Sequence, residues 1–160
     1  NWNGSKDTDI SVGAYHVLEL DTDGTEQAEH FINAVGEDLS GRLIPAVEVR
    51  LRGLYRLLPP DYYEAADNLA DFCDRIEKQY GVRPVIYCTE RTYKNIVASD
   101  SRFNKDKIWY ESLFSKPDED MDWTFWTYTN RVKFSFYESG EYLHMTVFNG
   151  SEDDFKKLII

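Results

Sequence analysis

Short apolar runs alternate with helical segments along most of this chain, and no other feature limits the fold as strongly. Residues 12–19 form a mostly apolar run, and residues 26–35, which are followed by a glycine, have the sequence pattern of a helix. A second apolar run, 43–51, precedes a long segment of helical periodicity between Asp61, a candidate N-cap, and Gly81, a helix stop. Such alternation is typical of parallel strands joined by helical crossovers. The pattern predicts the α/β class, as an open sheet or a barrel.

The alternation continues through shorter elements and then stops near the C-terminus. Apolar runs predict strands at residues 85–89, 108–112 and 123–129, with a short helix over 90–97. Residues 132–137 and 142–148 flank the turn sequence Glu138-Ser139-Gly140-Glu141 and predict a C-terminal β-hairpin. A final helix is expected to begin at Ser151, whose spacing to Asp154 fits a capping box. With 160 residues and no internal repeat, we expect a single domain over residues 1–160.

Composition excludes several classes of function. The net charge of -11 leaves no cluster of Lys and Arg to neutralise phosphates, which argues against nucleic-acid binding. No run approaches the roughly 18 to 20 apolar residues of a membrane span. The sequence lacks a serine nucleophile elbow, a phosphate-binding glycine loop and a dinucleotide fingerprint. Neither Cys73 nor Cys88 has a second Cys or a His nearby at the spacing of metal ligands, so we expect no metal site. We expect two buried thiols, with a disulfide between them as the alternative.

Six short strings, in order along the chain, resemble glycoside hydrolase family 25, the lysozymes (muramidases) that cut the glycan strand of peptidoglycan. They are Gly13-Ala14-Tyr15-His16, Pro45-Ala46-Val47-Glu48-Val49, Gly81-Val82-Arg83-Pro84-Val85-Ile86-Tyr87, Ile108-Trp109, Trp123-Thr124-Phe125-Trp126-Thr127-Tyr128-Thr129-Asn130 and Val147-Phe148-Asn149-Gly150. The resemblance implies an irregular (β/α) TIM-like barrel with its first strands missing at the N-terminus. In such barrels the working residues project from the carboxyl ends of the strands.

The resemblance also shows where this chain departs from the family. Members carry an Asp-x-Glu pair at the end of one strand; here Glu48 holds the Asp position and Arg50 holds the position of the catalytic Glu. A family Asp in a later strand corresponds to His144, and the usual Gln between Trp and Tyr is Thr127. Of the family's acidic cluster only Glu48 keeps a counterpart. The family's chemistry needs no cofactor, so none is implied.

These departures bear directly on hydrolysis, which needs a carboxylic acid to protonate the leaving oxygen. Arginine stays protonated and cannot serve. Glu48 and Arg50 are two apart on one strand, so they share a face, where the cation favours the ionised carboxylate. Glu19 and Glu111 lie near the ends of predicted strands and are weak candidates for a replacement acid; the alternative is that each is a solvated loop carboxylate.

Six residues are candidates for substrate binding, each with a structural alternative. Arg50 could bind an anionic group such as the lactyl or peptide carboxylate of a muropeptide, or form an ion pair with Glu48. His144 could be an acid/base group or a packing residue. The aromatic candidates could form a sugar-stacking wall or belong to the core: Tyr87, Trp109, Trp126 and Tyr128. His16 sits between apolar neighbours and is expected in or near the core.

We therefore expect a domain that binds peptidoglycan or another cell-wall glycan with impaired hydrolysis. The alternatives are an active muramidase that uses Glu48, or a structural scaffold without catalysis. A protein partner, or an N-terminal segment outside this chain, could cover the open edge of the barrel. The resemblance alone implies an extracellular or cell-wall location.

Overall fold

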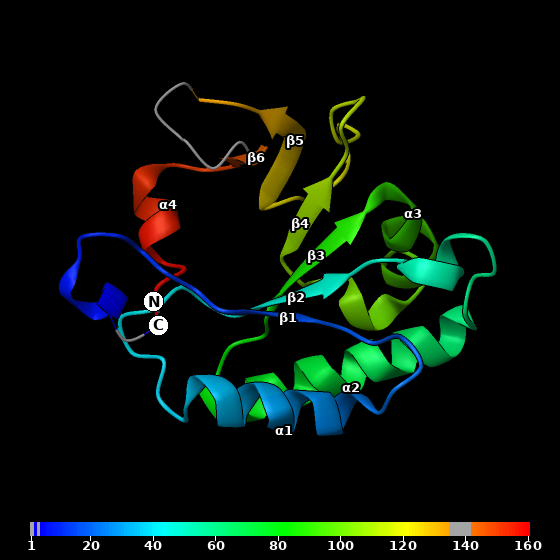
Figure 1. Ribbon diagram of the computed structural model, residues 1–160, viewed down its shortest axis with the longest axis horizontal. Coiled ribbons are helices and arrows are strands. Elements are labelled where there is room, and N and C mark those ends of the chain that lie inside the picture. The colour runs from blue at the N-terminus through cyan, green and yellow to red at the C-terminus, as the bar shows by residue number, and fades with distance from the viewer. Residues whose placement is uncertain (1, 3, 135–141) are drawn as a thin grey trace.

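A six-stranded sheet, with its strands in the order of the sequence, runs through the molecule (Figure 1). The computed structural model describes residues 2, 4–134 and 142–160. Its strands are β1 (Tyr15–Val17), β2 (Ala46–Val49), β3 (Val85–Thr89), β4 (Ile108–Glu111), β5 (Phe125–Val132) and β6 (Leu143–Phe148). Neighbouring strands from β1 to β5 are parallel, and β6 is antiparallel to β5. The predicted α/β class is confirmed, and in the described residues the sheet runs from β1 at one edge to β6 at the other.

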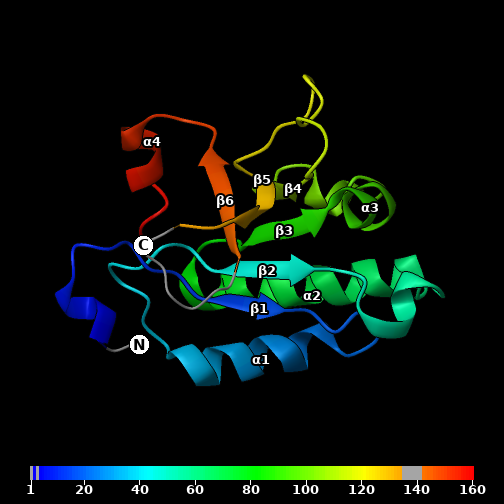
Figure 2. The same ribbon diagram turned by 45° about the horizontal axis from the view of Figure 1, so that its top comes forward.

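Helices connect the parallel strands from β1 to β4, whereas residues 112–124, between β4 and β5, form a crossover without a helix. The α-helices are α1 (Gly24–Val35), α2 (Tyr62–Tyr80), α3 (Glu90–Thr92) and α4 (Glu152–Lys156). Shorter turns are 3-10 helices at Gly4–Asp7, Gly53–Arg56 and Ser101–Phe103, and a π-helical turn at Tyr93–Val97. Helices α1 and α2 lie side by side against one face of β1, β2 and β3 (Figure 2). No helix among the described residues is long and apolar enough to cross a membrane.

The core lies between this helical layer and the sheet. Val47 and Val49 of β2 and Ile86 of β3 have no exposed surface and belong to one cluster with the apolar stripe of α2. That stripe includes Leu69, Phe72, Cys73 and Ile76. His16 also faces the helices: its ring stacks on Phe72 at a centroid distance of 4.9 Å and hydrogen-bonds Gln27. Cys73 and Cys88 are both buried and free.

Local sequence signals set the ends of α2. The Asp61 carboxylate accepts hydrogen bonds from the backbone N–H groups of Tyr63 and Glu64, and Gly81 ends the helix with φ 74°. This left-handed conformation suits glycine, which has no Cβ to clash. Gly24 serves a different purpose, because a Cβ there would lie 1.9 Å from the Asn68 carbonyl oxygen. The absence of a side chain lets the start of α1 approach the backbone of α2.

A C-terminal antiparallel pair forms, and the partner of β6 is β5. Strand β6 pairs with β5, with Phe125 opposite Phe148 and Val132 opposite Leu143. Strand β5 corresponds to the strand predicted at 123–129 and extends to Val132; residues 133 and 134 of the expected first strand, 132–137, are not in a strand, and its residues 135–137 lie outside the described residues. The pairing places Thr127 beside Thr146, whose hydroxyl oxygens are 2.7 Å apart, and packs Phe125 against Phe148. These cross-strand contacts fix the register. The capping box of Ser151 and Asp154 at α4 is confirmed.

Candidate functional site

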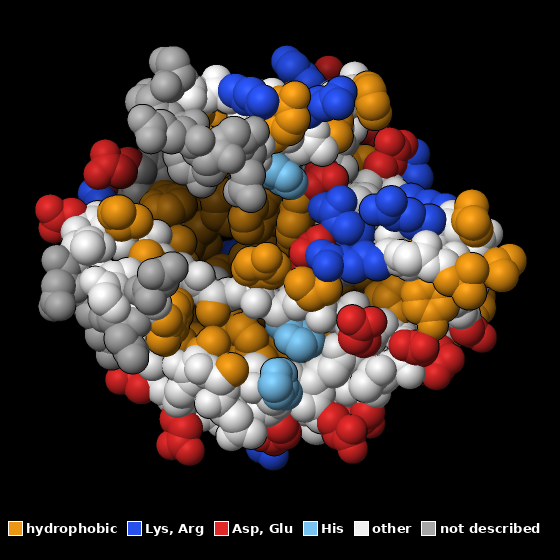
Figure 3. Space-filling model, viewed as in Figure 1, with side chains coloured by type: hydrophobic (Ala, Val, Ile, Leu, Met, Phe, Trp, Pro, Cys, Tyr) orange, Lys and Arg blue, Asp and Glu red, His pale blue; other side chains and the backbone are white. Residues whose placement is uncertain are grey.

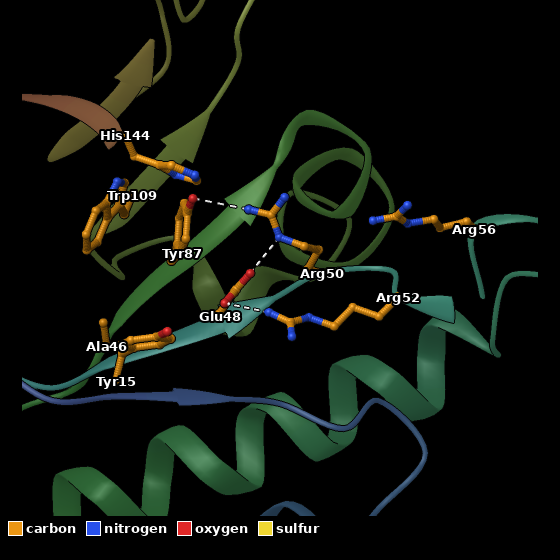
Figure 4. A pocket seen from close by; sticks show the side chains of 9 residues that line it. All are labelled: Tyr15, Ala46, Glu48, Arg50, Arg52, Arg56, Tyr87, Trp109 and His144. Carbon is orange, nitrogen blue, oxygen red and sulfur yellow. Dashed lines mark hydrogen bonds and ion pairs between the residues drawn. The ribbon is translucent and has the colours of Figure 1, made fainter. Parts of the chain in front are cut away.

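A cavity of about 610 Å³ opens at the face of the sheet that the helices do not cover. Strands β1 to β4 each contribute at least one side chain to it, and β6 contributes from the antiparallel side. Figure 4 shows its lining: Tyr15, Ala46, Glu48, Arg50, Arg52, Arg56, Tyr87, Trp109 and His144. The carboxyl ends of the parallel strands therefore bring charged and aromatic side chains together, where barrel-type folds place their working residues.

Arg50, which lines this cavity, binds two carboxylates. Its Nε donates to Glu48 Oε1 at 2.5 Å, and its two terminal nitrogens donate to Glu111 Oε1 and Oε2 at 3.0 and 2.7 Å. The Tyr87 hydroxyl also donates to Glu111 and accepts from Arg50 at 3.1 Å. Glu48 and Glu111 are only 6% and 8% exposed, so their charges rely on these partners.

The network shifts the titration of its members. Burial alone would raise the pKa of Glu111, but the hydrogen bonds from Arg50 and Tyr87 outweigh it and lower that pKa below its ordinary value. The hydrogen bond to Glu111 raises the pKa of Arg50 despite burial. Burial, followed by the bond to Glu111, raises the pKa of Tyr87. Near neutral pH the network therefore holds an ionised Glu111, a protonated Arg50 and a neutral Tyr87.

Two of the four predicted aromatic residues line the cavity. The rings of Tyr87 and Trp109 are 4.7 Å apart, and Trp109 Nε1 donates to the Thr127 hydroxyl at 2.8 Å. Trp126 and Tyr128 are not brought to this cavity. Trp126 is opposite Tyr110 in the β4–β5 register, and its Nε1 donates to the Ser112 carbonyl oxygen at 3.0 Å. Strand alternation puts Trp126 and Tyr128 on the opposite face from Trp109.

The other predicted residues divide between the cavity and its surroundings. His144 projects from β6 toward Tyr87 and Arg50 (Figure 4) and is exposed, so it is not a packed core residue. Its charge also favours the ionised form of Glu111. Glu19 is exposed and lines an adjoining hollow, together with Arg50 and Arg52. Glu19 therefore lies beside the cavity and outside its lining.

Comparison with known proteins settles the family. The family described as Glycosyl hydrolases family 25 matches residues 1–135. This chain belongs to glycosyl hydrolase family 25. A family 25 glycosyl hydrolase from Bacillus anthracis superposes with a TM-score of 0.85 and 31% identity, covering 100% of this chain and 74% of that one. The Streptomyces coelicolor lysozyme gives 0.80 at 23% identity, with 99% and 76% covered, which supports the fold alone.

A curated relative gives no information about function. An uncharacterized protein from Escherichia coli O157:H7, YegX, is 28% identical over 162 residues, which span 99% of this chain. The match covers 56% of YegX, so the chain spans little more than half the length of that relative. The family resemblance read from the six strings is therefore confirmed by the family match and by the fold. The YegX match adds no activity to it.

The family 25 cavity also contains residues that were not predicted. Arg52 lies on the same side of the chain as Glu48 and donates to its Oε2 at 3.0 Å, and Arg56 follows in the next turn. The two-residue alternation through 48, 50 and 52 could have indicated Arg52. Nothing local indicated Arg56, because a 3-10 turn carries it back to the cavity. No group of His, Cys, Asp and Glu within residues 2, 4–134 and 142–160 could hold a metal ion.

Proposed function

We propose that this family 25 domain binds the glycan strand of peptidoglycan with little or no hydrolysis. The observation that supports this is Arg50, which occupies the position where the resemblance puts the catalytic Glu and binds both Glu48 and Glu111. Because peptidoglycan forms the bacterial cell wall, we place the domain's action there or in the extracellular space.

The chemistry follows from the protonation states. Cleavage of a glycosidic bond needs a group that gives a proton to the leaving oxygen, and such an acid normally has a raised pKa. Glu111 has a lowered pKa, and Glu48 accepts ion pairs from both Arg50 and Arg52. Each carboxylate is therefore held as an acceptor of hydrogen bonds. A sugar can still stack on the aromatic side of the cavity.

The test measures hydrolysis and binding side by side on purified peptidoglycan. We expect the parent protein to bind the sedimented wall and to release no reducing sugar above a protein-free blank. The variant Arg50→Glu restores a carboxyl group at the family position; Lys78→Glu makes the same charge reversal on an exposed residue of α2, away from the cavity. Hydrolysis gained by Arg50→Glu and not by Lys78→Glu would identify Arg50 as the residue that prevents hydrolysis in the parent protein.

Other outcomes point to the alternatives. Wall clearing by the parent protein would contradict the proposal and favour an active muramidase, in which Glu48→Gln should abolish turnover. Absence of both binding and hydrolysis, in a protein with a folded circular dichroism spectrum, would favour a structural scaffold. Circular dichroism of Arg50→Glu is required in the same series, because that change puts three carboxyl groups next to one another.

A further inference from the structure

The cavity has one cationic wall and one aromatic wall. Figure 4 shows Arg52 and Arg56 reaching in from the segment that follows β2, while Tyr15 and Trp109 lie on the opposite side. In Figure 3 the same division appears as Lys and Arg side chains beside a hollow with hydrophobic walls. This arrangement separates two binding tasks, since aromatic faces contact sugar rings and guanidinium groups bind anions.

Arg50 is already occupied by groups of the protein itself. Four hydrogen bonds run from its guanidinium to Glu48, Glu111 and Tyr87. A guanidinium has five N–H donors, so little capacity is left for a ligand. Arg50 therefore organises the cavity, and a bound anion must be held by other residues.

Arg52 and Arg56 have more free N–H donors than Arg50. Arg52 gives one hydrogen bond to the residues that the structure describes, from Nη2 to Glu48, and 54% of its side chain is exposed. The Arg56 guanidinium is exposed and has no hydrogen bond or ion pair to any residue that the structure describes. Glu19 lines the adjoining hollow and forms no ion pair with Arg52 in the same described ranges.

The charge balance of the cavity opposes that of the whole chain. Three guanidinium groups line the cavity, those of Arg50, Arg52 and Arg56, against the single carboxylate of Glu48. Counting Glu111 as well, which lies outside this lining and binds Arg50, still leaves one positive charge in excess at the cavity. The chain as a whole carries a net charge of -11. A local cationic site on an acidic protein attracts an anionic group that the remaining surface repels.

We infer that the cavity selects a carboxylate-bearing sugar strand, with the sugar ring against Trp109 and Tyr15 and the carboxylate held by Arg52 and Arg56. This inference rests on the proposed function and names the substrate class of the same site. Carboxylates of two sources share this chemistry in peptidoglycan: the lactyl group of muramic acid after its peptide has been removed, and the stem peptide itself. If the lactyl group is the ligand, an amidase that removes the peptide must act first.

The experiment is a titration with three soluble glycans of equal length. The first is an N-acetylglucosamine–N-acetylmuramic acid tetrasaccharide with free lactyl carboxylates; in the second these are converted to primary amides; the third carries stem peptides. We expect the amidated glycan to bind at least tenfold more weakly, about 1.4 kcal/mol, than a carboxylate-bearing one. Tight binding of the first glycan assigns the lactyl carboxylate, and tight binding of the third alone assigns the peptide; either supports the inference.

Matched variants test whether Arg52 and Arg56 cause the preference for carboxylate-bearing glycans. Arg52→Gln/Arg56→Gln should abolish the preference for carboxylate while weak binding of the amidated glycan persists. The control Lys78→Gln/Lys105→Gln removes the same charge from exposed positions outside the cavity and should keep the preference. Equal binding of all three glycans by the parent protein, or a preference that survives the arginine substitutions, would overturn the inference and leave the proposed function standing. Absence of binding to every glycan would reject both.

Discussion

On β2, Val47 and Val49 point toward the helices, whereas Glu48, together with Arg50 just after the strand, points into the cavity. The first pair is buried among apolar side chains from α2 and needs no specific partner. The second pair is charged: the buried Glu48 and the partly exposed Arg50 are held by ion pairs of 2.5 and 2.7 Å, the second of which joins Arg50 to Glu111 of β4. One face thus depends on packing, and the other on whether each charge keeps its partner.

The largest expected effect is on the packed face. Phe72 has no exposed surface, stacks on His16 and meets Phe31 edge-on at 6.2 Å. Phe72→Ala should lower the free energy of unfolding by about 3–5 kcal/mol, because it removes a large buried ring and leaves a cavity. Urea unfolding at neutral pH measures the change. Leu57→Ala, at a side chain that is 81% exposed, is the control and should change stability by less than about 0.5 kcal/mol.

The charged face should respond nearly as strongly when one partner is removed. Arg50→Met keeps much of the side-chain volume but leaves Glu48 and Glu111 without their shared cation. We expect a loss of about 3 kcal/mol at pH 7, at the lower end for a buried pair because 24% of the Arg50 side chain is exposed. Urea unfolding of the parent and the variant tests it. Unchanged stability would mean that the ion pairs only offset their own desolvation.

A smaller change in the free energy of unfolding is expected when acid protonates Glu111. The pKa of Glu111 is lowered in the folded protein, so the folded state binds fewer protons than the unfolded state near that pKa. The stabilisation is therefore complete above the ordinary value of 4.5 and is lost as the pH falls through the folded-state pKa. Urea unfolding between pH 7 and pH 3 should show a decline that is shallower in Glu111→Gln. An equally steep decline in that variant would assign the acid sensitivity to other carboxylates.

The smallest expected effect on stability comes from removing the N-terminal cap of α2. Asp61 caps α2, and Asp61→Ala should cost about 1 kcal/mol by leaving two backbone N–H groups without a side-chain acceptor. The midpoint of thermal unfolding by circular dichroism follows this change. Asp71→Ala removes the same side chain from an exposed position inside α2 and should have little effect. A similar loss in both variants would indicate a general charge effect in place of capping.

The sequence by itself determined the features that depend on near neighbours. The periodicity of α2, its ends at Asp61 and Gly81, and the Ser151 cap could be predicted directly, because the residues that make these contacts are two to four positions apart. The shared face of Glu48 and Arg50 follows equally from the two-residue repeat of a strand. The six strings that resemble the family, which occur in the family's order, also predicted the barrel-type fold to which these strands and helices belong.

Only the tertiary structure decided which of these residues meet across the sheet. Arg50 binds Glu111, 61 residues away, and the β4–β5 register places Trp126 on the face opposite to Trp109. Arg56 reaches the cavity through a 3-10 turn, and β6 pairs with an earlier strand segment than the turn residues indicated. The physical reason is shared: a shift of one residue in strand pairing reverses the face of every side chain, and that register is set by contacts between distant segments.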